Sequence, residues 1–306
     1  MQKPTFDPGL TQKFDGRLRR AINKDGSFNV RRRGVKWQNI NLYTHLINMS
    51  WPLFLTLVFF SYAAANVFFA SIYVLVGTQQ LRGADAPTAA ARFLNAFFFS
   101  AQTISTVGYG SLAPAGVAAN SVAAIEAMFG LMGFALATGL LFGRFSKPSA
   151  KIGFSKNMLW TPYQDGFSLQ FRIVNQRVNS LMELQATVML MTVQDEGGEL
   201  KREFKILPLE RPSVVFFPLT WTIVHPIDAQ SPLSGKTAAD LETLRAEFLI
   251  LIKGFDETFS QTVHARFSYR YDEVKWGGRF APAFSVEPSG DVVLDVDRVG
   301  DLVSQS

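Results

Sequence analysis

Two long stretches without charged residues dominate the first half of the chain. Residues 51–76 are almost all apolar or small, and no Asp, Glu, Lys or Arg stands between Lys36 and Arg82. At ~1.5 Å per residue, a helix of this length crosses a hydrocarbon core of ~30 Å. The stretch lies too far into the chain, and is too long, for a signal peptide. We therefore expect an uncleaved membrane span over residues 50–77.

The second stretch runs from Phe93 to Gly143 and is interrupted by a single charged residue, Glu126. It is too long for one helix, and its middle contains helix breakers, namely Gly108, Gly110, Pro114 and Gly116. We expect a second span over 118–145. The segment 93–114 is expected to enter the membrane without crossing it.

The flanks of the spans predict an orientation. Residues 1–36 form a basic arm with ten Lys or Arg against three Asp, and further basic residues follow the second span. Because the connection between the spans carries few charges, the positive-inside rule places both termini in the cytoplasm. Over 37–49, apolar residues recur at helical spacing between polar ones, which predicts a short amphipathic helix in the membrane interface.

After residue 156 the pattern changes to short strands. Segments that alternate or run apolar for six to twelve residues are rich in Val, Ile, Phe and Thr, and turn signals such as Asp165 and Gly166 separate them. This repetition predicts an all-β sandwich over 156–306, with one helical insertion at 238–245. Residues 146–155 are expected to link it to the second span.

Composition argues against an enzyme. The chain has no cysteine, which excludes disulfides, thiolate zinc sites and a cysteine nucleophile. The histidines His45, His225 and His264 are far apart, and no metal-ligand spacing occurs. For His45, close to the interface, a structural role and a pH-sensing role both stay open.

A glycine-containing motif stands between the spans, directly after an aromatic run over 93–102. A cation stripped of water needs oxygen dipoles on every side, and glycines let the backbone aim successive carbonyls at one axis. TVGYG loops are the known filters of potassium channels, so the assignment rests on recognition supported by physics. Potassium is expected at Thr106, Val107, Gly108, Tyr109 and Gly110. The alternative is a glycine-rich turn that only joins two anchors.

The chain resembles a known family in both halves. Segments 221–235 and 247–280 resemble the cytoplasmic signatures of inwardly rectifying potassium channels, and 53–148 resembles the pore of the family's prokaryotic branch. The resemblance implies a homotetramer in a bacterial inner membrane, with four immunoglobulin-like cytoplasmic domains extending the pore. It implies no cofactor besides the permeant potassium ion and no nucleic-acid partner, whereas polyamines and barium are expected as blockers.

The resemblance also assigns roles to individual residues. It implies a hydrophobic gate at Phe142, a second constriction at the loop containing Gly254 and Phe255, and cavity positions at Phe134 and Thr138. Arg144 and Lys147 are assigned as anionic-lipid contacts, with simple anchoring of the topology as the alternative. Glu183 and Lys253 are assigned as cytoplasmic-pore positions. Two glycines of the second span, Gly133 and Gly139, are either hinges or close-packing sites.

Departures from the family pattern change the expectation for rectification. Many relatives have a glutamate where this chain has Gln102, and strong rectifiers have an acid at the position of Phe134. Family acidic sites of the cytoplasmic pore correspond to Glu183, which is kept, and to Ser213 and Lys253, which are not acidic. We therefore expect weak rectification. Glu126 is either functional or buried against a polar group. A membrane-anchored β-sandwich that senses a ligand without conducting ions is the alternative function.

Overall fold

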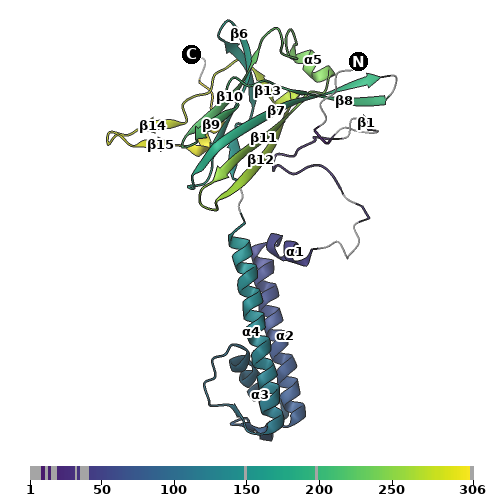
Figure 1. Cartoon of the computed structure of the whole chain (residues 1–306), viewed down its shortest axis with the longest axis vertical. Helices are drawn as coiled ribbons and strands as arrows, with labels where there is room; N and C mark the ends of the chain where they lie inside the picture. Colours follow the sequence, from purple (N-terminus) through teal and green to yellow (C-terminus); the bar gives the residue numbers. More distant parts are fainter. Residues whose placement is uncertain are drawn as a thin grey trace. The chain divides into compact units, whose positions relative to one another are not determined.

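The structure, a computed structural model, describes residues 8–10, 13–14, 19–31, 33–34, 41–147, 150–196 and 199–303. The chain divides into two compact units, one of residues 33–147 and one of residues 1–32 with 148–306 (Figure 1). Parts of four expected segments lie outside the described residues: part of the basic arm, 37–40 of the interfacial helix, 148–149 of the linker, and 197–198 and 304–306 of the β-sandwich.

The first unit is helical. Its described elements are α1 (Leu42–Asn48), α2 (Trp51–Val76), η2 (Thr78–Gln80), β2 (Leu81–Arg82), α3 (Ala89–Ile104), β3 (Ala113–Pro114) and α4 (Val117–Phe145). Helices α2 and α4 lie side by side, with α3 against them at the end far from α1 (Figure 1). Strands β2 and β3 pair antiparallel and tie together the two connections that flank α3.

Both long helices are suited to a membrane, as expected. Helix α2 has 26 residues and α4 has 29, and both are long and apolar enough to cross a bilayer. Large apolar side chains on α2 point outward, with Phe59 65% and Phe68 61% exposed. Helix α3 begins four residues before the expected Phe93, because the Thr88 hydroxyl caps it by accepting from the Ala91 N–H at 3.2 Å.

An apolar cluster holds α3 in the angle between α2 and α4. Tyr73 of α2, Ala96 and Phe99 of α3, and Ala119 of α4 are at most 4% exposed. The rings of Tyr73 and Phe99 meet edge to face with centroids 4.9 Å apart. Helix α3, which begins the segment expected to enter the membrane without crossing it and is called the pore helix below, is therefore packed on two sides by the candidate spans α2 and α4.

The second unit is the expected β-sandwich. Its six-stranded sheet has the order β1-β8-β7-β11-β12, with β9 on β7, and its five-stranded sheet the order β10-β6-β5-β13, with β4 on β6. The strands of the first sheet are β1 (Lys13–Phe14), β7 (Leu181–Glu196), β8 (Glu199–Ile206), β9 (Ser213–Phe216), β11 (Glu247–Asp256) and β12 (Gln261–Arg270). Those of the second are β4 (Ile152–Phe154), β5 (Met158–Tyr163), β6 (Gly166–Asn175), β10 (Thr220–Ile227) and β13 (Val274–Trp276).

The core of the sandwich is built from alternate residues of facing strands. On β11, Phe248, Ile250 and Ile252 are fully buried and pack with residues of the other sheet such as Phe171 and Ile223. Successive side chains of a strand point to opposite faces of the sheet, so every second residue faces the core. Helix α5 (Ala238–Thr243) starts at a capping box formed by Thr237 and Asp240.

Part of the basic arm covers the outer face of the first sheet. Leu249 points away from the core, yet it is fully buried because Ile22 of the arm packs on it. The Ala21 N–H donates to the Glu247 carboxylate at 3.0 Å, and Lys24 pairs with Glu273 at 2.5 Å. In the part of the arm that the structure describes, residues 19–31 are therefore folded onto the sandwich.

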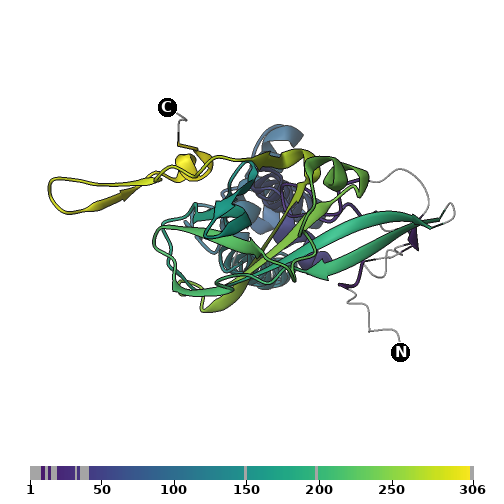
Figure 2. The same ribbon diagram turned by 90° about the horizontal axis from the view of Figure 1, so that it is seen from above.

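A hairpin of β14 (Phe284–Val286) and β15 (Val292–Leu294) projects from the two sheets (Figure 2). Its apolar side chains are open to solvent, with Val286 65% and Val292 52% exposed. The helical turns η3 (Tyr271–Glu273) and η4 (Val296–Gly300) flank this region in the chain.

Candidate functional site: the loop after the pore helix

The loop that follows α3 has an alternating backbone. Thr106, Gly108 and Gly110 have positive φ of 58°, 56° and 81°, whereas Val107 and Tyr109 between them do not. A backbone that alternates between left- and right-handed conformations turns successive amides to one side and successive carbonyls to the other. Glycine adopts the left-handed conformation readily, and Thr106 does so at a cost of roughly 1–2 kcal/mol.

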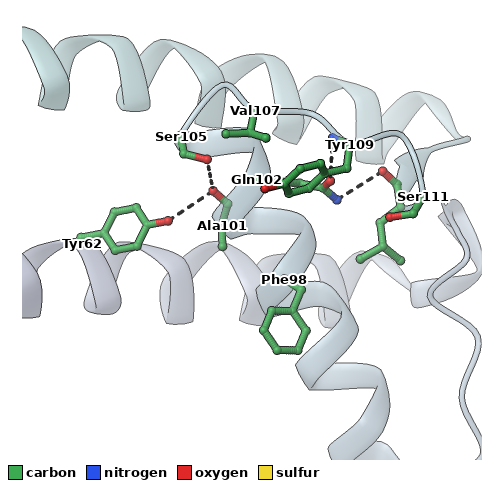
Figure 3. Close-up of a pocket in the computed structure, with 9 residues that line it drawn as sticks. Tyr62, Phe98, Ala101, Gln102, Ser105, Val107, Tyr109 and Ser111 are labelled. Atoms are coloured by element: carbon green, nitrogen blue, oxygen red, sulfur yellow. Dashed lines mark hydrogen bonds between the residues drawn. The ribbon is translucent and has the colours of Figure 1, made fainter.

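The amide side of the loop is bound to Gln102, near the end of α3 (Figure 3). The N–H groups of Val107 and Gly108 donate to the Gln102 carbonyl at 3.0 and 3.2 Å. The N–H of Tyr109 donates to Gln102 Oε1 at 3.1 Å, and Gln102 Nε2 donates to the Leu112 carbonyl at 3.4 Å. Gln102 therefore holds three amides of the loop and the chain beyond it.

This role of Gln102 was not predicted from the sequence, which marked it only as a departure from the family pattern. A neutral amide both accepts and donates, whereas an ionised glutamate accepts only. The side chain is 7% exposed, so each of its hydrogen bonds forms away from water. Gln102 thus makes a two-way hydrogen-bonded link, accepting from the Tyr109 N–H and donating to the Leu112 carbonyl.

The carbonyl side of the loop is open. Among the residues that the structure describes, no donor bonds the carbonyl oxygens of 106–110. The Val107 and Tyr109 side chains, 53% and 81% exposed, do not face these carbonyls but line a pocket that Gln102, Phe98 and Tyr62 also line (Figure 3). A row of free carbonyls is the ligand set that a dehydrated potassium ion needs. One chain supplies one wall of such a site.

Glu126 lies on the opposite side of α3 from this loop. Its carboxyl group is fully buried and accepts a hydrogen bond from the Tyr73 hydroxyl at 2.5 Å, and it also contacts the Ser100 hydroxyl. Of the two expectations for Glu126, burial against polar groups is therefore the one that the structure describes.

The predicted cavity and gate residues share one stripe of α4. Phe134, Thr138 and Phe142 are four residues apart, so they lie on one helix face. All three are exposed in the single chain, with Phe134 at 75% and Phe142 at 72%. This stripe is free to line a space shared with other copies.

The glycines of α4 differ in their surroundings. A Cβ atom at Gly133 or Gly139 would meet nothing within 4 Å, so neither mediates close packing within the described chain. At Gly130, a Cβ would lie 2.2 Å from the Ile104 carbonyl oxygen, where α3 ends. Gly130 is thus a close-packing glycine, as is Gly143, where a Cβ would lie 2.8 Å from the Tyr43 hydroxyl oxygen, and the sequence pattern distinguished neither from the other glycines of α4.

The predicted lipid contacts lie beside α1. The Arg144 guanidinium donates to the carbonyls of Leu46 at 2.6 Å and Met49 at 2.7 Å, which stabilises the end of that helix. It also lies 4.5 Å from the ring centroid of Trp51. Lys147 is exposed and bonds the Asn48 side chain. Arg144 is thus engaged in joining α1 to α4.

The residues predicted to line the cytoplasmic pore meet at one irregularity between β7 and β11 of the β-sandwich. The register shifts between Lys253, which pairs with Gln185, and Phe255, which pairs with Met182. Glu183 lies in this bulge with φ of 51°, and a Cβ at Gly254 would lie 3.2 Å from Leu184. Glu183 and Lys253 are both exposed.

The expectation of a loop at Gly254 and Phe255 is corrected in one respect. Both residues lie within β11, because pairing with β12 continues as far as Asp256. The turn begins only after Asp256, whose carboxylate accepts from the Thr258 N–H at 2.9 Å. The predicted constriction is therefore the end of a strand.

His225 is a structural residue. Its Nδ1 lies 2.6 Å from the Pro208 carbonyl and its Nε2 lies 2.8 Å from the Ser231 hydroxyl. Burial lowers the pKa of His225. In the part of the chain that the structure describes, no three His, Asp or Glu residues are placed to hold a metal ion.

Comparisons with known proteins agree in both halves of the chain. Residues 152–304 match the model of the inward rectifier potassium channel C-terminal domain, and residues 55–147 match the ion channel model. The inward rectifier potassium channel Kirbac3.1 of Paramagnetospirillum magnetotacticum is 36% identical over 287 residues, covering 92% of this chain and 95% of that protein. The human G protein-activated inward rectifier potassium channel 3 is 28% identical over 316 residues, covering 94% of this chain and 78% of that protein.

Proposed function

The chain belongs to the inward rectifier potassium channel family, and we propose that it forms a homotetrameric, potassium-selective pore whose filter is residues 106–110. Family membership makes it a membrane ion channel and not an enzyme. The observation that carries the proposal is the alternating backbone of the loop, with its amides bound to Gln102 and its carbonyls free.

A tetramer supplies what one chain lacks. Four copies around an axis would surround an ion with carbonyl oxygens from residues 106–109 and with four Thr106 hydroxyls. Backbone that is not helical is tolerated at membrane depth only when it is buried in protein or lines a water-filled path. Neighbouring copies would provide that burial for the exposed Val107 and Tyr109.

The gate of this channel would lie on the stripe of α4. Four Phe142 rings facing one another at the cytoplasmic end of the pore would form an apolar constriction that closes by excluding water. Gly133 and Gly139, which have open surroundings in the chain, are the positions at which α4 could bend. The cytoplasmic domain would add a second constriction at Gly254 and Phe255.

Rectification should be weak because the pore carries few acids. Phe134 gives the cavity no charge, and an exposed Lys253 beside Glu183 adds positive charge to the path of an internal polyamine. At ~4 Å and an effective dielectric constant of ~20, each lost pair of opposite charges forgoes about 4 kcal/mol before desolvation. Spermine would therefore block this channel less than channels that have acids at both positions.

Anionic lipid headgroups are the proposed partners of Arg144 and Lys147 in a bacterial inner membrane. Lys147 is exposed and can reach a headgroup directly, whereas Arg144 would act from its place between α1 and α4. With both termini in the cytoplasm, α1 would lie at the inner surface, where negative lipids attract basic residues.

Flux from purified protein in liposomes tests the proposal. Rubidium should enter potassium-loaded vesicles, and barium should block its entry, because both cations fit a carbonyl-lined filter. Gly108→Ala should abolish uptake while the tetramer persists, since alanine at φ of 56° is strained. Assembly without any barium-sensitive uptake by the unmodified protein would favour a ligand sensor that does not conduct.

A further inference from the structure

A small polar cluster is buried at membrane depth behind the pore helix. Asn66 and Tyr73 of α2, Ser100 of α3 and Glu126 of α4 are each at most 1% exposed. The cluster joins all three helices, and polar groups in such a place are retained only when each finds a partner. Within the described residues, no hydrogen bond joins these side chains to residues 106–110, so the conduction path does not account for them.

The contacts of the cluster form a continuous chain. The Tyr73 hydroxyl donates to Glu126 Oε2 at 2.5 Å, and the Ser100 hydroxyl lies against Glu126 Oε1 and 3.1 Å from Asn66 Oδ1. Asn66 Nδ2 donates to the Tyr62 carbonyl at 2.8 Å, which fixes Oδ1 as the atom that faces Ser100. Two oxygens therefore face the single hydroxyl proton of Ser100.

Counting protons identifies the state of the carboxyl group. If Glu126 is ionised, Ser100 can donate to Glu126 or to Asn66 but not to both, and one buried contact between two oxygens has no proton. If Glu126 is protonated, it donates to Ser100, which then donates to Asn66, and every contact is satisfied. The protonated form also places no charge at membrane depth.

The cluster and the filter contacts occupy opposite sides of α3. Ser100 and Gln102 are two residues apart, which is about 200° around a helix. Ser100 is directed to Glu126, and Gln102 is directed to the amides of residues 107–109. A rotation of α3 that loosened Ser100 would displace Gln102 from those amides.

We propose that Glu126, as a protonated carboxylic acid, is a positioning residue of the filter: through Ser100 it fixes the rotation of the pore helix and thereby the hold of Gln102 on the filter amides. The proposal rests on the proposed function, because it assigns Glu126 to the same filter. It gives the buried carboxyl group a part in selectivity without contact with the permeant ion.

Substitutions at Glu126 test whether the filter depends on the hydrogen bonds of this side chain or on a negative charge at residue 126. Glutamine can donate to Ser100 and accept from Tyr73, so E126Q should keep the ratio of rubidium to sodium uptake and the half-blocking barium concentration within about threefold of the unmodified protein. In E126A the Tyr73 and Ser100 hydroxyls lose their partner, and in E126D the shorter side chain does not reach both hydroxyls. Both should lower the ratio by about tenfold or more, the scale of a lost buried hydrogen bond.

Two further variants keep the test decisive if E126A fails to assemble. S100A and Y73F each remove one hydroxyl, and we expect both to reduce selectivity with the tetramer intact, S100A more strongly because it breaks the direct link to α3. The matched control is S71A on α2, since the Ser71 hydroxyl bonds only its own helix at Val67, 2.7 Å away. It should behave as the unmodified protein.

The outcomes are distinct. Loss of selectivity in E126Q equal to that in E126A would show that a charge is required and would overturn the proposal. Unchanged selectivity and barium block in S100A and in assembled E126A or E126D would overturn it as well. An unmodified protein without preference for rubidium over sodium would instead refute the potassium filter itself, and this inference with it.

Discussion

Replacing Gly130 by alanine should disrupt the filter although the residue does not line it. The added Cβ would lie 2.2 Å from the Ile104 carbonyl oxygen and 3.0 Å from the Ile104 carbonyl carbon. Because these are backbone atoms, no side chain can move aside, and α3 must shift by roughly 1 Å to restore an ordinary contact. The strain of such overpacking is about 1–3 kcal/mol per chain, against a gain in helix propensity of about 1 kcal/mol.

The shift occurs at the residue where α3 ends and the filter loop begins, so four chains would move their carbonyls together. We expect Gly130→Ala to lower rubidium uptake and the rubidium-to-sodium ratio at least about tenfold in liposomes, with less heat-stable tetramers in detergent. Gly133→Ala is the control, because a Cβ there meets nothing within 4 Å. It should preserve the ion ratio even if a stiffer helix slows opening. Unmodified uptake and selectivity in Gly130→Ala would refute the packing argument.

Three other predictions address the proposed gate, the polyamine block and the β-sandwich. Phe142→Ser should raise basal rubidium flux by hydrating the constriction, and unchanged flux at normal expression would move the gate to Gly254 or the filter. Phe134→Asp, alone or with Lys253→Glu, should strengthen voltage-dependent spermine block in patch recordings, whereas steep micromolar block of the unmodified channel would reveal acids elsewhere in the pore. Burial lowers the pKa of His225, so as the pH falls below about 6.5 this histidine is protonated in the unfolded chain before it is protonated in the folded chain. Stability present above about pH 6.5 should therefore decline as the pH falls below it, as thermal unfolding at pH 7.5 and 5.5 would measure. His225→Gln should reduce this dependence and His264→Gln, at an exposed position, should retain it.

The features that could be predicted from sequence are those encoded within one segment. Apolar runs of sufficient length indicate spans in any context, and residues 106–110 carry their backbone preference in their own glycines. The strands of the sandwich are likewise visible as short alternating runs. Two spans and an all-β domain are therefore confirmed.

The features that could not be predicted from sequence depend on contacts between different elements of the fold. The pattern of α4 treats its glycines alike, and only the end of α3 against Gly130 distinguishes that residue. In the sequence, Arg144 is one of the basic residues at the end of the second span, yet its guanidinium group donates to carbonyls at the end of α1. The family resemblance implied a loop at Gly254, but pairing with β12 extends the strand beyond it. Contacts between separate elements decide each of these cases.

The reversal potential of purified protein in a planar bilayer, with potassium on one side and an equal concentration of sodium on the other, tests the central claim most directly. A filter that favours potassium by about 100-fold discriminates by about 2.7 kcal/mol, which corresponds to more than about 100 mV at ~2.3 kcal/mol per 100 mV. We predict a reversal potential of that size, with the sign for potassium and with currents that barium abolishes. A barium-insensitive current that reverses near zero would contradict the account.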